Sequence, residues 1–352
     1  MHVVHVCRSG WPAIGGLESA VHGLAKALVG RGHRATVVTL DRDRNGQRLH
    51  PAFHEGVAYR RVRRRGPRRY PWARGLRQAV EDADLVHVHG IDGLADQLAH
   101  RSKGPPIGLS THGGYFHTPF ATVLKRGWWR CVTRRTLARL DAVWFTSKAD
   151  ATRFADVAGR IVPNGIEAAR FRGPRRPDRD RWVVLGRVVP HKGVADLLDA
   201  LRHQSDPVPH LELIGPVSEA DRRTLHAASG PTRVHCWGTR SVAFVRSRLA
   251  RAAWAVFPSR YEGFGLAALE AMAAGVPTIV ANIPALREAV TEGVTGRIAD
   301  FGKPGSAARV LDACRHSDGE ALGRAGAAVA QRADWSQRVE GFLAAYQTVR
   351  RP

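Results

Sequence analysis

Two series of short apolar segments, each segment followed by a helical pattern, constrain the fold of this chain more than any other feature. The first series begins with HVVHVC and continues through RATVVTL and ADLVHVHG; the second begins with RWVVLGRV and continues through HLELIG and AWAVFPS. Continuous apolar strands that alternate with helices are typical of parallel sheets covered on both faces. The sequence therefore predicts an α/β protein with two Rossmann-like, doubly wound domains.

A segment rich in proline, glycine and charge, IVPNGIEAARFRGPRRPDRDR at residues 161–181, separates the two series. We expect an N-terminal domain over residues 1–165 and a C-terminal domain over residues 175–334. The end of the chain, DWSQRVEGFLAAYQTVR, has an amphipathic pattern, and we assign a helix at about residues 335–352 to the N-terminal domain. Two such domains usually bind ligands in the cleft that they face, at the carboxyl ends of their strands.

The composition is that of a globular protein with a strongly basic balance. The chain has 54 Lys and Arg residues against 31 Asp and Glu residues, a net charge of +23. No apolar run approaches the ~18 residues of a membrane span. The N-terminus reads as a strand and not as a signal peptide, so we expect a cytoplasmic protein. The cysteines form no C-x-x-C pair, which argues against a zinc site and a disulfide framework.

The positive charge is concentrated in the first half of the chain, in two stretches. Residues 59–77, YRRVRRRGPRRYPWARGLR, hold nine arginines and no acidic residue, and residues 124–140, LKRGWWRCVTRRTLARL, interleave basic residues with two tryptophans. Such surfaces suit nucleic acid, or anionic lipid head groups with tryptophan at the interface. The structural alternative is a solvated face with one core tryptophan.

Gly15 and Gly16 follow the first strand and precede a helix. Paired glycines let the backbone approach a ligand, and a helix N-terminus favours an anion. Glycine before a helix is also common for structural reasons alone. The chain shows no G-x-G-x-x-G here and no G-x-x-x-x-G-K-[ST], so neither a dinucleotide dehydrogenase nor a P-loop enzyme is supported.

His112 lies at the end of a strand in STHGGYFHT. A histidine there can hydrogen-bond sugar hydroxyls or a phosphate, or carry a proton. A lone histidine is more often structural, but this position favours a functional interpretation. His117 and the strand-end His89 are weaker candidates.

The loop LGRVVPHKG places Arg187 and Lys192 five residues apart, before Gly193 and a helix. Two cations beside a helix N-terminus can hold a diphosphate. In a chain this basic, such a pair also arises easily by chance.

The stretch RYEGFGLAALEAMAAG follows the strand AWAVFPS. Gly263-Phe264-Gly265 can direct backbone N–H groups toward an oxygen-rich ligand. Glu262 and Glu270 are separated by seven residues, and because carboxylates repel phosphate oxygens, we expect each to accept hydrogen bonds from neutral hydroxyls. The structural alternative is a glutamate that satisfies the helix dipole, plus one exposed glutamate.

These motifs together resemble glycosyltransferase family 4, whose enzymes have the GT-B fold. The E-x7-E motif is present as EGFGLAALE, GRVVPHKG resembles the family's diphosphate loop, and VPNGIEAARF resembles its interdomain segment. The resemblance implies a retaining hexosyltransferase that needs no metal, and the chain shows no DxD-type metal motif. It implies these roles: Arg187 and Lys192 bind the donor diphosphate, Glu262 and the backbone of Gly263, Phe264, Gly265 and Leu266 hold the donor sugar, Glu270 binds the ribose, Gly15 and Gly16 lie by the diphosphate, and His112 lies by the transferred sugar.

Three further segments, MHVVHVCRSGWPAIGGLESAV, LVHVHGIDGLADQLA and LSTHGGYFHTPFATVLKRGWW, look similar to the AceA/GumH type of mannosyltransferase. That likeness implies transfer of mannose from GDP-mannose to a polyprenyl-diphosphate-linked saccharide in polysaccharide assembly. The basic first domain fits an acceptor held at the inner face of the membrane, so we expect peripheral contact with anionic lipid and no nucleic acid. The alternatives are a UDP-sugar donor with another acceptor, a sugar-nucleotide epimerase, and a nucleic-acid-binding protein.

Overall fold

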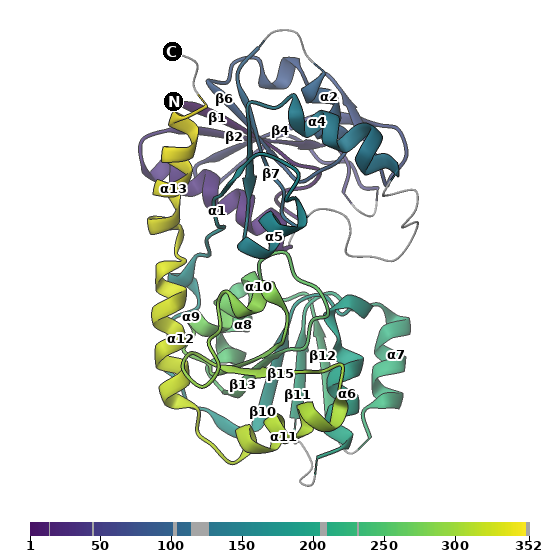
Figure 1. Cartoon of the computed structure of the whole chain (residues 1–352), viewed down its shortest axis with the longest axis vertical. Helices are drawn as coiled ribbons and strands as arrows, with labels where there is room; N and C mark the ends of the chain where they lie inside the picture. The colour runs from purple at the N-terminus through teal and green to yellow at the C-terminus, as the bar shows by residue number, and fades with distance from the viewer. Residues whose placement is uncertain are drawn as a thin grey trace. The chain divides into compact units, whose positions relative to one another are not determined.

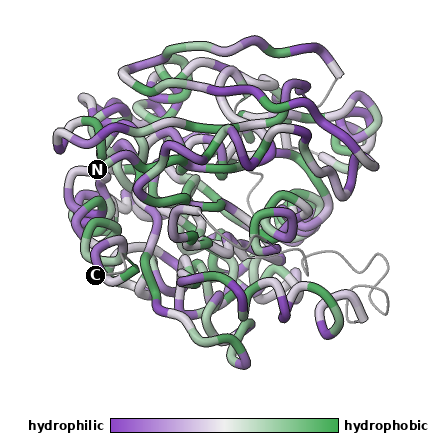
Figure 2. Tube along the Cα trace, turned by 90° about the horizontal axis from the view of Figure 1, so that it is seen from above, coloured by the Kyte–Doolittle hydropathy of each residue, from purple (hydrophilic) through white to green (hydrophobic). Residues whose placement is uncertain are grey.

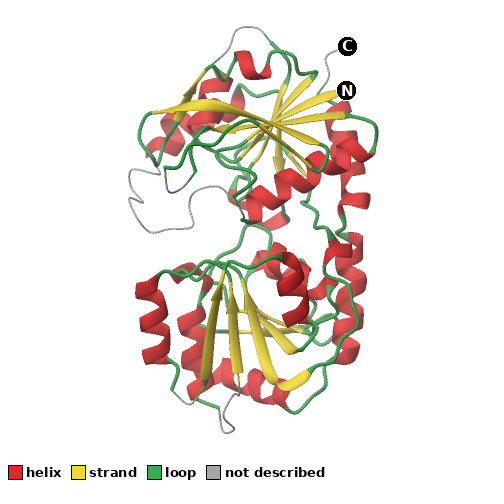
Figure 3. Ribbon diagram, turned by 180° about the vertical axis from the view of Figure 1, so that it is seen from behind, coloured by secondary structure: helices red, strands yellow, loops and turns green. Residues whose placement is uncertain are grey.

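The computed structural model describes residues 1–13, 15–43, 46–100, 104–113, 127–204, 210–230 and 232–349. The chain divides into two compact units, residues 1–165 with 335–352, and residues 166–334 (Figure 1). Each unit has its own mainly parallel sheet with helices packed on it (Figure 3). The predicted α/β fold class with two doubly wound sheets is confirmed.

The sheet of the first unit has the order β3-β4-β2-β1-β6-β7-β8-β9, with β5 paired to β4. Its pairs are parallel, except that β4 pairs with β3 and β5 in antiparallel fashion. The strands are β1 (His2–Val6), β2 (Arg34–Leu40), β3 (Ala52–His54), β4 (Val57–Arg65), β5 (Trp72–Arg74), β6 (Leu85–His89), β7 (Ile107–Ser110), β8 (Ala142–Phe145) and β9 (Arg160–Ile161). The helices are α1 (Gly16–Gly30), α2 (Gly93–Ala99), η2 (Trp129–Thr133), α4 (Arg134–Ala138), α5 (Lys148–Arg153) and α13 (Trp335–Gln347), with the short turn η1 (Gln78–Val80).

Helix α13 returns from the end of the chain to the first unit. Gly23 of α1 allows the approach, because a Cβ there would lie 2.1 Å from the indole nitrogen of Trp335. At the other end of the helix, the buried Tyr346 hydroxyl lies 2.8 Å from Nδ1 of His87 on β6. The helix ends at Gln347, short of the expected residue 352, and residues 350–352 lie outside the described part.

The sheet of the second unit is parallel throughout, in the order β12-β11-β10-β13-β14-β15. Its centre is apolar: Trp182 and Trp254 are paired across neighbouring strands and are buried. The strands are β10 (Asp178–Leu185), β11 (His210–Ile214), β12 (Arg233–Gly238), β13 (Ala252–Phe257), β14 (Thr278–Ala281) and β15 (Arg297–Ala299). The helices are η3 (Ala168–Arg170), η4 (Pro190–Lys192), α6 (Val194–Arg202), α7 (Glu219–Ala228), α8 (Val242–Leu249), α9 (Leu266–Ala273), α10 (Pro284–Arg287), α11 (Pro304–Arg315) and α12 (Glu320–Arg332).

The apolar stretches of the chain are short and alternate with hydrophilic ones (Figure 2). Among the described residues, no helix combines the length and the apolar character that crossing a membrane would require.

Candidate active site

The strand order of the second unit switches between β10 and β13, which are neighbours in the sheet although β11 and β12 separate them in sequence. Ligands of open α/β sheets bind beside such a switch, at the carboxyl ends of the strands. The loops at this point are residues 186–193, after β10, and residues 258–265, after β13. They hold most of the residues selected from the sequence.

The first loop ends close to the second because of a glycine. Gly193 has a left-handed φ of 67°, and a Cβ added to it would lie 2.0 Å from the carbonyl oxygen of Pro258. Only glycine accepts both conditions at little cost. Near the start of the same loop Arg187 is exposed, and its guanidinium makes no hydrogen bond or ion pair with a described residue. It is therefore available to an anionic ligand.

An ion pair joins the two loops. The Lys192 ammonium donates a hydrogen bond to Oε1 of Glu262 at 2.5 Å, and the Ser259 hydroxyl donates to the same oxygen at 2.8 Å. The Lys192 and Glu262 side chains are only 18% and 12% exposed. Within the described chain, Oε2 of Glu262 accepts no hydrogen bond and is not fully buried. The carboxylate is thus held in place through Oε1, and its Oε2 can accept a hydrogen bond from a hydroxyl group of a ligand.

Two side chains that the sequence did not single out support this arrangement. The guanidinium of Arg260 makes two hydrogen bonds with the Asp196 carboxylate on α6, at 2.5 and 2.7 Å. The Arg260 amide donates to the carbonyl oxygen of His191 at 2.9 Å. Asp196 lies in the first turn of α6, a position that a capping analysis would note but would not connect with a residue 64 positions away.

Helix α9 begins without a side-chain cap. Gly265 is its N-cap residue with a left-handed φ of 86°, and no acidic residue lies in the first turn, which begins at Leu266. The preceding Phe264 packs against the core of the unit, and Gly263 directly follows Glu262. An uncapped helix N-terminus presents unpaired N–H groups and a partial positive charge, which suit a phosphate.

Glu270 lies on α9, one turn beyond this N-terminus, and is partly buried. Burial raises the pKa of its carboxyl from 4.5 to about 7, Arg170 partly opposes the rise, and Glu167 adds to it. No hydrogen bond or ion pair links Glu270 or Arg187 to the Lys192–Glu262 pair in the described chain. The structure therefore joins two of the four charged candidates directly and leaves the other two separate.

The raised pKa of Glu270 gives a pH-dependent prediction. Between pH 4.5 and about 7 the folded protein keeps a proton that the unfolded chain has lost, so this group's contribution to stability is full below pH 4.5 and is lost as the pH rises through 7. Glu270→Gln does not titrate, so the melting temperature of this variant relative to the natural protein should increase from pH 5 to pH 8. Differential scanning calorimetry checks this, with Glu219→Gln, an exposed site on α7, for the background pH dependence. A difference that stays constant or decreases with pH would contradict the prediction.

In the first unit, Gly15 and Gly16 lie at the start of α1, with Gly15 as an extended N-cap residue and no side-chain cap. Glu18, in the first turn, is buried and accepts a hydrogen bond from the Ser9 hydroxyl. Glu18 was not among the residues selected from the sequence. The sequence contained a signal for its burial: Glu18 follows the paired glycines by two residues and lies on the helix face that carries the buried Val21 and other apolar residues.

His112 is the end of a chain of imidazoles. Its Nε2 lies 3.0 Å from Nδ1 of His89, and Nε2 of His89 lies 2.9 Å from Nδ1 of His5. Its Nδ1 lies 3.3 Å from the side-chain amide nitrogen of Asn164. His112 also has a left-handed φ of 48°, which is unusual for a residue other than glycine. Both of its ring nitrogens are therefore engaged by the protein. The weaker candidate His117 lies outside the described residues.

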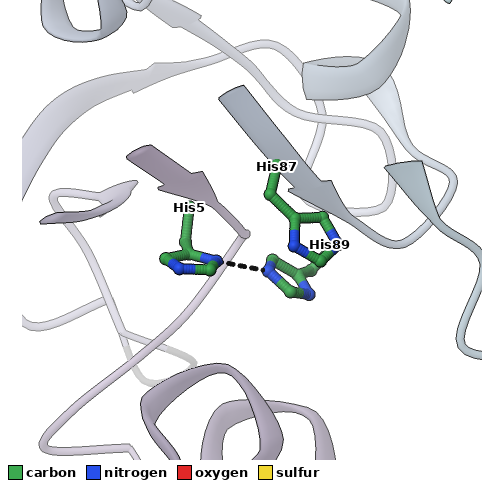
Figure 4. Close-up of side chains that lie close together, drawn as sticks. All are labelled: His5, His87 and His89. Atoms are coloured by element: carbon green, nitrogen blue, oxygen red, sulfur yellow. Dashed lines mark hydrogen bonds between the residues drawn. The ribbon is translucent and has the colours of Figure 1, made fainter. Parts of the chain in front are cut away.

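The buried imidazoles of His5, His87, His89 and His112 are uncharged at neutral pH. Figure 4 shows His5, His87 and His89 side by side on β1 and β6. Burial lowers the pKa of His112 to about 4 and that of His5 to about 3, and it holds the pKa values of His87 and His89 well below the usual range. His112 can therefore act through hydrogen bonds and is no cation for a diphosphate at pH 7. His89, which the sequence ranked low, is its direct partner.

Known proteins resemble this chain over nearly its whole length. A family model described as Glycosyltransferase Family 4 matches residues 14–170, and one described as Glycosyl transferases group 1 matches residues 165–329. A protein of Xanthomonas oryzae pv. oryzae named GDP-mannose:cellobiosyl-diphosphopolyprenol alpha-mannosyltransferase is 34% identical, over 98% of this chain and 96% of the relative. One of the same name from Komagataeibacter xylinus is 32% identical, over 99% and 93%. The chain belongs to glycosyltransferase family 4.

Solved structures agree with this family assignment at the level of the fold. Sucrose-phosphate synthase from Thermosynechococcus elongatus superposes with a TM-score of 0.79 at 21% identity, covering 99% of this chain and 98% of its own. HepE from Anabaena in complex with UDP-glucose gives a TM-score of 0.75 at 21% identity, covering 98% and 100%. The GT-B fold expected of this glycosyltransferase is confirmed, as is its assignment as a hexosyltransferase.

Proposed function

We propose that this glycosyltransferase moves mannose from GDP-mannose to a polyprenyl-diphosphate-linked saccharide, with retention of the anomeric configuration. The names of relatives that are 32% to 34% identical over almost the full chain support this donor and acceptor. They favour it over a UDP-sugar donor, an epimerase and a nucleic-acid-binding protein. The site itself supports the reaction class through the geometry of its charged groups.

The observation that carries the proposal is the Lys192–Glu262 pair, which lies in the loops beside the uncapped N-terminus of α9. The α9 N-terminus and the Arg187 guanidinium would stabilise the negative charge that develops on the leaving diphosphate. The free Oε2 of Glu262 would accept a hydrogen bond from a hydroxyl of the donor sugar, and Lys192 would hold that carboxylate in its orientation.

The nucleophile of the proposed reaction is the acceptor hydroxyl, and the leaving diphosphate receives its proton. The acceptor hydroxyl would attack on the face from which the diphosphate leaves, and the departing phosphate oxygen would take its proton. His112 would lie by the transferred sugar and would not carry that proton, because its ring is uncharged and both ring nitrogens are engaged by the protein. Glu270 would bind the ribose hydroxyls. Because the Arg187 guanidinium and the α9 N-terminus would already face the diphosphate, we propose a reaction that needs no metal or cofactor.

The surface of the first unit supports an acceptor at a membrane. The two basic stretches meet where Tyr70 contacts the ring of Trp128 edge-on, at 5.1 Å between ring centroids. Trp128 and Trp72 are 43% and 49% exposed, whereas Trp129 packs against the core. Exposed tryptophans among arginines suit an anionic membrane surface. We therefore place the enzyme at the inner face of the cell membrane as a peripheral protein. Residues 124–126 of the second stretch lie outside the described chain.

The decisive test of the function is a transfer assay with a synthetic cellobiosyl-diphosphate lipid. We expect a mannosylated product, identified by mass spectrometry, with GDP-mannose and not with UDP-glucose. Anomeric retention is read by NMR. A product formed from the donor alone, without the acceptor, would instead indicate an epimerase.

Arg187→Ala is expected to weaken GDP binding by about ten-fold, the lower end of the range for a charge-assisted hydrogen bond, because the side chain is exposed. Isothermal titration calorimetry with GDP measures the change. Arg223→Ala, which removes an exposed arginine from α7, is the matched control and should leave the affinity unchanged. Equal affinities in all three proteins would exclude Arg187 from the diphosphate site.

A further inference from the structure

A charged pocket lies in the first unit. It measures about 320 Å³. It opens just beyond the carboxyl end of β2 and along the last residues of β4. Its lining is Asp41, Arg42, Arg48, Leu49, His50, Pro51, Arg61 and Arg63. The carboxyl ends of parallel strands are where α/β domains bind ligands.

The arginines of this pocket, of about 320 Å³, have no acidic partners. Arg42, Arg48, Arg61 and Arg63 form no ion pair with a described residue. The one carboxylate in the lining, Asp41, accepts a hydrogen bond from the backbone amide of Arg64 through Oδ1. Four guanidinium groups around one carboxylate leave a strong positive potential, which an anion would neutralise.

Arg61 is the most informative of the four. It is partly buried, and its guanidinium donates to three neutral oxygens: the Thr39 hydroxyl and the carbonyl groups of Trp11 and His50. Its charge also lies 5.1 Å from the centre of the Tyr59 ring. A partly buried charge is costly unless it is paired. The fold therefore fixes this cation in a set orientation and leaves its counter-ion to be supplied from outside.

The surroundings of the pocket indicate an anion that carries a lipid. Arg63, in the lining, pairs with Arg74 across β4 and β5, and two residues further along β4 Arg65 pairs with Trp72. Residues that face each other or alternate along such a strand pair share one face of the sheet. Trp72 is 49% exposed on that face. The pocket thus continues into an exposed aromatic side chain, which suits a membrane interface and not a soluble sugar phosphate.

We infer that this arginine pocket binds the diphosphate of the lipid-linked acceptor, an inference that rests on the proposed function. Arginine pairs with phosphate oxygens through two parallel hydrogen bonds, and several arginines can share one diphosphate. The carbonyl of Trp11 connects Arg61 to the loop that leads to Gly15 and Gly16. The acceptor would then lie at the carboxyl ends of the strands of this unit, with its lipid directed along β4 toward Trp72.

The probe for this site is farnesyl diphosphate, titrated by calorimetry in the presence of saturating GDP so that the donor site is filled. The natural protein should bind farnesyl diphosphate and not farnesol. Arg48→Gln/Arg63→Gln should weaken binding at least about ten-fold, since two charge-assisted contacts are lost. Arg160→Gln/Arg233→Gln removes the same charge at exposed positions that do not line the pocket, and it should leave the affinity unchanged.

Two further measurements separate this inference from its alternatives. GDP affinity should be the same in both double variants, so a loss of donor binding cannot be mistaken for a loss of acceptor binding. Binding to phosphatidylcholine vesicles with phosphatidylglycerol is measured separately, because Arg63 belongs to the basic stretch at residues 59–77 and its loss should weaken vesicle binding as well. Equal loss of farnesyl diphosphate affinity in both variants, no binding by the natural protein, or a pocket variant that loses only vesicle binding would each overturn the inference. Mannosyl transfer that persists in any of these cases would leave the proposed function intact.

Discussion

Replacing Glu262 with alanine is expected to lower kcat/KM for mannosyl transfer about a thousand-fold, the loss typical when a positioned electrostatic group is removed. The carboxylate connects two loops through Lys192 and Ser259, and its second oxygen is available to a sugar hydroxyl. Its removal takes away that acceptor and leaves the Lys192 ammonium without its partner. Initial rates over a range of GDP-mannose concentrations, with the lipid-linked acceptor saturating, give the value.

Two variants make this result specific. Glu262→Gln keeps the shape of the side chain and an oxygen for Ser259, so a similar loss of activity would identify the charge as the essential property. Glu219→Ala removes an exposed carboxylate from α7 and should retain full activity. The far-UV circular dichroism of all three variants should match that of the natural protein. A fully active Glu262→Ala enzyme would remove this residue from the mechanism.

Gly193→Ala should have the second largest effect, about a hundred-fold loss of kcat/KM, comparable to the cost of displacing a reacting group by about 1 Å. A left-handed conformation costs alanine roughly 1–2 kcal/mol. The added Cβ would also lie 2.0 Å from the carbonyl oxygen of Pro258, so the loops after β10 and β13 must separate. Lys192 and Glu262 are on opposite sides of that separation. The same transfer assay, together with thermal unfolding, measures both consequences.

Other glycines provide the controls for this substitution. Gly32 has a left-handed φ of 79° but open space around its Cβ position, so Gly32→Ala tests backbone strain without a clash. Gly305, at the start of α11, has open space and no left-handed φ, so Gly305→Ala tests neither. Both variants should keep their activity. Equal losses in Gly32→Ala and Gly193→Ala would show that strain, and not the position of the loop, is responsible.

The fold class could be predicted from the sequence because buried strands of a parallel sheet are apolar on both faces. HVVHVC and AWAVFPS each became a strand, β1 and β13, with almost every residue buried. The order of the strands could not be predicted, because it depends on long-range pairing. β10 and β13 are adjacent because of that strand order, and their adjacency brings Lys192 to Glu262.

The sequence predicted site residues whose role depends on their own backbone conformation. It predicted less well those whose role depends on a partner elsewhere in the chain. Gly193 and Gly265 adopt left-handed conformations next to helices, a preference that is local and can be read from the sequence. Lys192 was expected to face a diphosphate, and the structure pairs it with a carboxylate from another loop. Glu18, Asn164 and Arg260 were missed, since each acts through a partner that is distant in sequence or through burial. Sequence spacing carries no information on such pairs.

The imidazole chain has a direction that one amide sets. If Asn164 presents its NH2 group, Nδ1 of His112 must accept, so His112 carries its hydrogen on Nε2 and donates to His89, which in turn donates to His5. If Asn164 presents its oxygen instead, every hydrogen in the chain moves to the opposite nitrogen. The ring of His5 ends the chain with a buried Nε2 that has no partner in the described residues. Asn164 lies one residue before the end of the segment 1–165. A rotation of its side-chain amide by half a turn thus exchanges donor and acceptor nitrogens in three buried rings, and none of the rings has to move.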